Sequence, residues 1–233
     1  MIVAESFWDL FPDARIGVAI ARGIDNASAA EQTGALLAEA TAEAGAALAG
    51  AEIASHPAVA PWRAAYAQFG AKPSKFRSSI ESLLRSAQAG RLRAINPLVD
   101  LYNTVSLRHG LPCGGEDLAA IVGDIQLTRA RGGEPFRTIG AERDEPPLPG
   151  EVIYADAAGA ICRCFNWREA DRTKLTASTA DAILVIESLP AHSPAQLDAA
   201  LGDLAALVRS YLGGVVRTAV LDRANPILRQ DAE

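Results

Sequence analysis

The segment 95–117 carries the clearest structural signals in this chain of 233 residues. Asn96 followed by Pro97 has the form of a helix N-cap and a first-turn proline, whose missing N–H would be unpaired at that position anyway. Apolar residues then recur at helical spacing, and Gly110 suits the left-handed position that ends many helices. The pattern therefore predicts one well-capped helix that ends in a tight turn.

Two glycines, Gly114 and Gly115, follow this helix and precede a predicted helical turn at 118–121. Their lack of side chains would leave backbone N–H groups uncovered, in a concavity suited to an oxygen atom or an anion. The preceding helix would deliver a polar side chain, Asn103, close to this loop. An ordinary corner between two helices explains the same residues, and the local pattern does not choose between the two interpretations.

The first half of the chain is mostly helical by pattern, and the second half changes to the two-residue period of strands. An alternating, β-branched run predicts a first strand at 14–22, and it is followed by predicted helices at 29–49, 56–69 and 76–89. Later strands are predicted at 124–130, 136–140, 151–155, 160–165 and 181–187, and a closing helix at 194–212.

Composition excludes several classes of protein. Apolar residues make up 49% of the chain, and no tract is free of charge for the length of a membrane span, so we expect a soluble protein without a membrane partner. The first residues include an early acid and no basic region, unlike a signal peptide. Cys113, Cys162 and Cys164 are too few for a disulfide framework and have no zinc-site spacing. We expect buried thiols, with Cys162 and Cys164 on the same side of a strand, no metal, and a cytoplasmic location.

The charge pattern points to a local rather than a global interaction with nucleic acid. The formal net charge is −6, so no overall basic field is present. Within 72–93, however, six basic residues accompany the single acid Glu81. Lys72, Lys75 and Arg77 stand at a helix start, where the helix dipole disfavours cations. Contact with backbone phosphates would explain them, and a solvated helical face is the alternative.

The segment 166–173 gathers an amide, an indole, two guanidinium groups, two carboxylates and a hydroxyl directly after a predicted strand. Such density at the end of a strand is typical of binding groups on a rigid scaffold, although a solvated loop with internal ion pairs is equally compatible. Glu116, Glu169 and Asp171 are the candidates for a general base. No serine or cysteine has the context of a catalytic nucleophile.

Six segments in sequence order carry a resemblance to a known family: 96–105, 110–112, 114–117, 149–154, 166–168 and 173–176. The first three resemble the tRNA-editing (B3/B4) domain of the bacterial phenylalanyl-tRNA synthetase β subunit. The last three are similar to free-standing proteins built from that domain alone. The resemblance covers residues 62–216 and implies an α/β (α+β) unit with a helical first half and a largely antiparallel sheet in the second half. We expect the whole chain, 1–233, to form a single domain.

The synthetase domain hydrolyses the ester that joins a wrong amino acid to the 3′ end of tRNA. The resemblance therefore implies a trans-editing hydrolase that deacylates mischarged aminoacyl-tRNA, needs no cofactor and does not bind DNA. The synthetase domain has a histidine near the position of Gly114, and its glutamate aligns only loosely with Arg168 and Glu169. These departures leave open a non-catalytic tRNA-binding module of the same fold. The acidic net charge leaves open an enzyme that acts on a small free metabolite.

A positioned water and a stabilised oxyanion suffice for this chemistry, because an aminoacyl ester is already activated. The residues expected to act in catalysis are Asn103, Glu116 and Asn166. Those expected to bind the substrate are Tyr102, Gly114, Gly115, Arg168 and Thr173. Those expected to bind tRNA are Lys72, Lys75 and Arg77. In this scheme the glycine N–H groups hold the carbonyl oxygen or the terminal ribose, and the asparagines orient the α-amine or the water.

Overall fold

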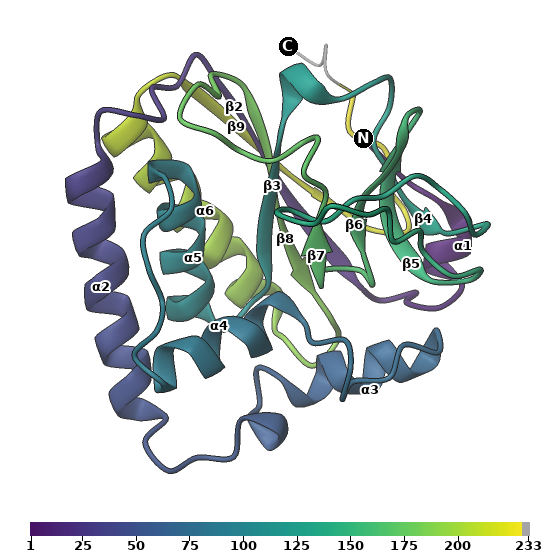
Figure 1. Ribbon diagram of the computed structural model, residues 1–233, viewed down its shortest axis with the longest axis horizontal. Coiled ribbons are helices and arrows are strands. Elements are labelled where there is room, and N and C mark those ends of the chain that lie inside the picture. The colour runs from purple at the N-terminus through teal and green to yellow at the C-terminus, as the bar shows by residue number, and fades with distance from the viewer. Residues whose placement is uncertain (230–233) are drawn as a thin grey trace.

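An antiparallel sheet crosses the middle of the molecule in the computed structural model, which describes residues 1–229 (Figure 1). Its strand order is β3-β8-β2-β9. The strands are β2 (Arg15–Arg22), β3 (Cys113–Asp117), β8 (Ala182–Ser188) and β9 (Val215–Leu221). The two inner strands, β2 and β8, are rich in apolar and β-branched residues, as expected for strands that are covered on both faces.

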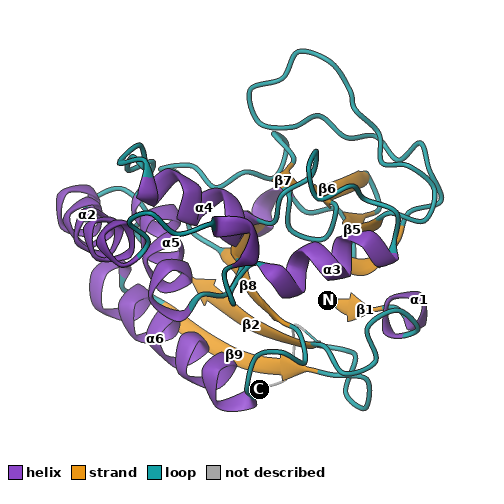
Figure 2. Cartoon of the chain, turned by 90° about the horizontal axis from the view of Figure 1, so that it is seen from below, coloured by secondary structure: helices purple, strands orange, loops and turns teal. Residues whose placement is uncertain are grey.

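Helices cover one face of this sheet. α5 (Pro97–His109) and α6 (Pro194–Leu212) pack on it, and α2 (Ala30–Ala47) packs on α5 from outside (Figures 1 and 2). Side chains alternate across each strand, so Leu184 and Ile186 belong to the core beneath the helices, whereas Ile183 belongs to the core on the opposite face. The alternation therefore gives the sheet two separate hydrophobic cores.

A second sheet lies on that opposite face. Its strands are β1 (Ile2–Val3), β4 (Gln126–Arg129), β5 (Val152–Asp156), β6 (Gly159–Arg163) and β7 (Arg168–Glu169), hydrogen-bonded in that order. The β1–β4 pair is parallel and the other pairs are antiparallel. The short helices α1 (Glu5–Trp8) and α3 (Ala60–Gln68) lie on this side, whereas α4 (Ser79–Gln88) packs against α2 and α5. Single 3₁₀ turns occur at Ile53–Ser55 and Leu118–Ala120.

The mixed α/β fold with helices early and antiparallel strands later is confirmed, and so is the capped helix at its centre. The Asn96 side chain accepts a hydrogen bond from the backbone N–H of Val99 at 3.1 Å, and Gly110 closes α5 in the left-handed conformation with φ of 65°. All three cysteines are buried thiols, as expected. No helix within residues 1–229 is both long and apolar enough to cross a membrane.

Three local predictions are wrong. The glycine-containing segment 113–117 is an edge strand paired with β8 and not a loop that opens onto a helix. The strand that contains Cys162 ends at Arg163, and Cys164 adopts a positive φ of 47°, so the two thiols do not alternate along one strand. The segment 136–140 forms only an isolated bridge between Thr138 and Ala170. In each case pairing between distant segments determines the conformation.

A buried ion pair fixes the connection into β5. The Arg163 guanidinium donates to both carboxylate oxygens of Glu151, with N–O distances of 2.9 Å, and both side chains are almost fully buried. Arg163 also donates to the backbone carbonyl of Glu145 at 2.8 Å. Because two charges buried together hold each other in place, this pair ties the proline-rich loop to the second sheet.

Candidate functional site

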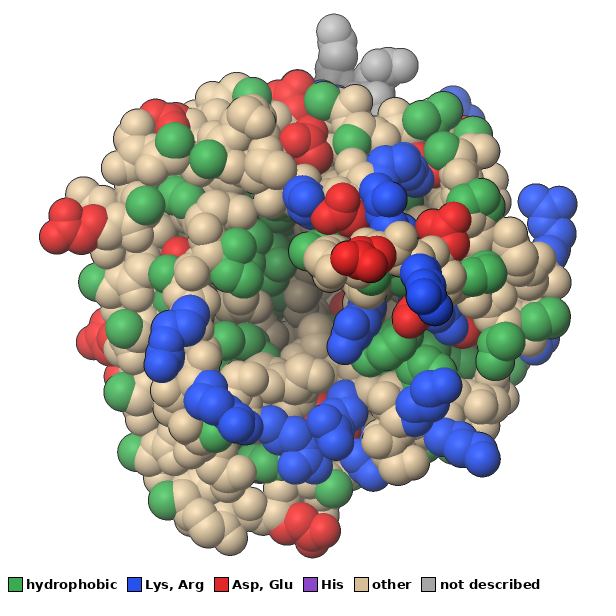
Figure 3. Space-filling model, in the orientation of Figure 1, with side chains coloured by type: hydrophobic (Ala, Val, Ile, Leu, Met, Phe, Trp, Pro, Cys, Tyr) green, Lys and Arg blue, Asp and Glu red, His purple; other side chains and the backbone are tan. Residues whose placement is uncertain are grey.

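A cavity of about 430 Å³ opens between the two sheets. One wall comes from β3 and β8, and the other from β5, β6 and the segment that contains β7. Helices α4 and α5 contribute further side chains, and the rest of the lining comes from connecting segments, namely Met1, Leu92, Ile125, Thr138 and Ile139. Figure 3 shows the surface hollowed where β3, β7 and α4 converge in Figure 1. The volume falls in the range of small-molecule binding sites.

Strand register determines which side chains face this cavity. Glu116 pairs with Ile183, and Gly114 pairs with Val185, so all four lie on the face of the sheet directed at the second sheet. Glu187, two residues after Val185, lies on that same face. Together with Glu169 from β7, the cavity therefore contains three carboxyl groups on a mainly apolar lining.

Burial raises the pKa of both Glu169 and Glu116. Burial raises the pKa of Glu169 to about 7, while the backbone N–H of Gly115, which donates to its Oε1 at 3.4 Å, opposes this rise. The pKa of Glu116 is raised well above its usual value, first by burial and then by the neighbouring Glu169 carboxylate. Both carboxyl groups therefore keep their protons to a higher pH than an exposed glutamate does.

A second set of polar side chains is hydrogen-bonded along the same cavity. The Tyr154 hydroxyl donates to Glu187 at 3.0 Å, and the Tyr66 hydroxyl donates to the Asn166 side-chain oxygen at 2.9 Å. Burial raises the pKa of Glu187 to about 8. Within the described residues, Glu187 Oε2 and Asn166 Nδ2 are buried and form no hydrogen bond of normal length, although the Asn166 side chain lies near enough to Glu187 to lower its pKa. Since unpaired buried polar atoms are costly, these two atoms are suited to receive a polar group of a ligand.

The cavity brings together seven of the residues expected to act in catalysis or substrate binding, namely Tyr102, Asn103, Gly114, Gly115, Glu116, Asn166 and Arg168. Thr173 is fully buried but is not part of the cavity lining. Its hydroxyl lowers the pKa of Glu116, against the larger opposite effects of burial and Glu169. The structure places the seven lining residues in the cavity, and their roles in catalysis or binding remain predictions.

The three cations expected to bind tRNA lie outside the cavity. Lys72 and Lys75 occur in the turn between α3 and α4, and Lys75 lies over the Phe76 ring, 5.1 Å from its centroid. The Arg77 Nε is 3.9 Å from the carboxylate of Glu81, one turn further along α4. That ion pair gives Arg77 a stabilising contact which the sequence interpretation did not consider.

The two glycines differ in what their missing side chains would touch. A Cβ at Gly114 would lie 2.8 Å from Glu169 Oε1, inside the cavity. A Cβ at Gly115 would collide with Leu184 and lie 3.0 Å from the Ile183 carbonyl, within the central sheet. Bare backbone is therefore needed for the cavity at Gly114 and for strand packing at Gly115.

Sequence reasoning missed Glu187 and gave Glu169 only a general mention as a possible base. Glu187 follows five apolar residues of β8, and an acid within such a run is a usable signal because isolated buried carboxylates are costly. Asp171, the third candidate base, forms an ion pair with Lys174 at 2.7 Å instead of lining the cavity. No group of three His, Cys, Asp or Glu side chains in residues 1–229 is arranged to hold a metal ion.

Comparison with known proteins adds a family match and a distant structural likeness. A family model described as the B3/4 domain matches residues 61–213. The crystal structure of an N-terminal fragment of the phenylalanyl-tRNA synthetase β subunit from Pyrococcus horikoshii is similar, with 11% sequence identity and a TM-score of 0.47. The similarity covers 92% of this chain and 49% of that one, so the chain spans about half the length of the synthetase fragment. No curated protein sequence matches the chain.

Proposed function

Because the chain belongs to the B3/4 domain family, we propose that it is a cytoplasmic trans-editing hydrolase, acting as a single domain, that releases wrongly attached amino acids from tRNA. The matched segment contains most of the cavity lining, including the three carboxyl groups. The observation that carries the proposal is the placement of the Glu169 and Glu116 carboxyl groups in one partly apolar cavity, where burial raises the pKa of each. Two carboxyl groups in one buried site, with pKa values above the usual range, are suited to act as base and acid in one reaction.

In the proposed reaction, water attacks the ester carbonyl carbon and Glu169 accepts the proton from that water. The negative charge that develops on the carbonyl oxygen receives hydrogen bonds from neutral Glu116 and from the Asn103 amide. The bond between the carbonyl carbon and the ribose oxygen then breaks, and the proton held by Glu169 passes to the ribose oxygen. The products are a free amino acid and unacylated tRNA, and no covalent intermediate on the protein is required.

The remaining lining supports binding of an aminoacyl group. Ile161, Ile183 and Val185 provide an apolar wall for its side chain, and Arg168 provides a guanidinium group beside Trp167. The Gly115 N–H holds Glu169 in the cavity instead of serving the substrate oxygen directly. This assignment differs from the original expectation that both glycine N–H groups bind the substrate.

Incubation of the protein with a panel of mischarged tRNAs, followed by measurement of the ester that remains, tests the proposal. We expect accelerated deacylation of at least one pair of amino acid and tRNA, and loss of that acceleration in Glu169→Gln. A matched control is Glu142→Gln, which makes the same chemical change at an exposed residue outside the cavity. No acceleration for any pair would refute the proposal.

A non-catalytic tRNA-binding module is the second candidate. It is favoured by Gly114, which stands near the position where the resembled synthetase domain has a histidine. The same panel separates the two candidates, because a module would bind tRNA without shortening the lifetime of any ester.

A further inference from the structure

Three arginines surround one buried carboxylate where α3 meets α4. Glu81, in the first turn of α4, is fully buried, and its Oε1 lies 2.8 Å from Arg63 Nη1 and 3.0 Å from Arg85 Nη2. The Arg77 Nε is 3.9 Å from the same oxygen. We refer to Arg63, Arg77, Glu81 and Arg85 as the Glu81 cluster.

The Glu81 cluster carries more positive charge than it needs for its own stability. One carboxylate faces three guanidinium groups, which leaves an excess of two positive charges. The arginine side chains remain 29%, 50% and 39% exposed for Arg63, Arg77 and Arg85, so each presents N–H groups to solvent. A buried anion that holds several guanidinium groups together lowers the entropic cost of binding an external anion.

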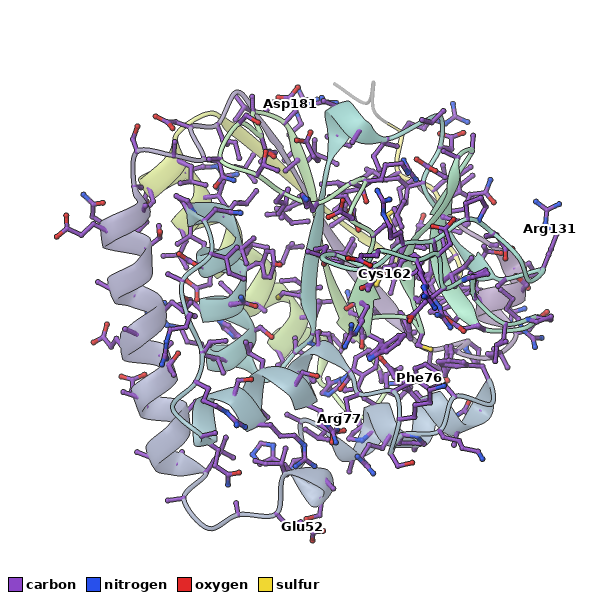
Figure 4. The ribbon with its side chains drawn as sticks, in the orientation of Figure 1. Glu52, Phe76, Arg77, Arg131, Cys162 and Asp181 are labelled. Atoms are coloured by element: carbon purple, nitrogen blue, oxygen red, sulfur yellow. The ribbon has the colours of Figure 1, made fainter. Side chains whose placement is uncertain are left out.

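The Glu81 cluster lies at the rim of the cavity. Phe76, next to Arg77, packs edge-on against the cavity residue Trp167 with a centroid distance of 4.7 Å. Ser79, two residues after Arg77, lines the cavity, and its backbone N–H donates to the Asn166 carbonyl at 2.9 Å. Figure 3 shows a band of lysine and arginine side chains below the hollow, and Figure 4 labels Phe76 and Arg77 on this lower side.

We propose that the Glu81 cluster binds a backbone phosphate of the RNA strand whose 3′ end occupies the cavity. The choice of RNA rests on the proposed function, whereas the anion site rests on the cluster itself. Guanidinium groups match the geometry of phosphate oxygens and bind them through paired N–H donors. Glu81 is a positioning residue in this arrangement, because it contacts the arginines and not the phosphate.

The test measures binding of unacylated tRNA as a function of salt concentration. The first variant is Arg77→Gln, which removes the arginine held most loosely by Glu81 and therefore should not disturb folding. The second is Arg85→Gln, which removes another cation while Arg63, 2.8 Å from Glu81, continues to pair with the buried carboxylate. Arg131→Gln, at an exposed position in a loop remote from α4, is the matched control (Figure 4).

Each lost phosphate contact should reduce the slope of log affinity against log salt by about 0.7, the value for single strands. If the variant and the unmodified protein bind equally at 1 M salt, this difference in slope makes the variant bind about fivefold more weakly at 0.1 M salt. We expect both test variants to show this change and Arg131→Gln to behave as the unmodified protein.

Unchanged affinity and slope in Arg77→Gln would overturn the inference, and so would weaker binding with an unchanged slope, because that loss would not come from a phosphate. Weaker binding of inorganic phosphate alone, with tRNA binding unaffected, would overturn the assignment to RNA. Because unacylated tRNA contains no ester, a protein that shows the expected salt dependence but hydrolyses no aminoacyl-tRNA would support this inference and refute the deacylase activity.

Discussion

Replacement of Glu169 by glutamine should make the protein more stable and less active. Burial raises the pKa of this carboxyl group from 4.5 to about 7 in the folded protein. Between these values the folded state holds more protons than the unfolded state, so the free energy of unfolding falls as pH rises through that window. Each pKa unit corresponds to about 1.4 kcal/mol, so the stability lost as pH rises from 4.5 through about 7 is at most about 3.5 kcal/mol. Because the Glu169 side chain is partly exposed, screening by solvent reduces this contribution.

Glutamine has the same shape but cannot ionise, so the free energy of unfolding of the variant should not fall in this pH window. Its stability relative to the unmodified protein should therefore increase between pH 4.5 and about 7 and stay constant above. Its deacylation rate should be about 100- to 10,000-fold lower, the usual contribution of a general base. The rate of the unmodified protein should rise with pH through about 7 and then level off, and the variant should lack this step.

Urea unfolding at a series of pH values gives the stability curves, and deacylation corrected for spontaneous hydrolysis gives the rates. Glu142→Gln controls for the loss of one acidic group, since this residue is exposed and lies outside the cavity. A Glu169→Gln protein that is less stable at pH 8 than the unmodified one would show that the carboxylate is not strained by burial. A variant with the original rate and pH profile would show that Glu169 is not the base.

Other substitutions separate catalysis from packing. Asn103→Ala should lower the deacylation rate with little change in unfolding free energy, because the side chain lines the cavity and has no described hydrogen bond within the protein. A loss of stability at unchanged specific activity would contradict this expectation. Gly114→Ala should reduce activity with near-normal stability, whereas Gly115→Val should destabilise the central sheet by about 1–3 kcal/mol, as over-packing does; paired rate and urea measurements distinguish the two, and equal effects would refute the assignment of faces. Arg163→Met should lower the free energy of unfolding by about 3–5 kcal/mol, because it leaves Glu151 as an unpaired buried charge. A thermal unfolding midpoint within about 1 °C of that of the unmodified protein would refute this account.

Much of the cavity lining could be predicted from residue types and their order, but the sequence did not show which side chains face one another across the cavity. Asn103 and the segment 166–168 are polar groups attached to strongly predicted elements, and they do meet in one cavity. Thr173 belongs to the same polar segment, yet it is buried outside the lining, because a loop that leaves a strand can turn either way. Glu187 was overlooked because an acid after a run of apolar residues indicates a buried carboxyl group but does not show which cavity that group faces.

The sequence by itself determined the elements whose signals lie within a few residues of one another. The cap at Asn96, the turn at Gly110 and the closing helix Pro194–Leu212 depend on contacts within one or two helical turns, so local residue preferences are sufficient. The tertiary structure decided that Gly114 and Gly115 form a strand. Glycine by itself does not favour a strand, and the backbone hydrogen bonds that stabilise this one come from β8, about 70 residues away in the sequence. It also decided the chemistry of Glu116 and Glu169, since their raised pKa values come from burial between two sheets, a property of the packed chain and not of either residue.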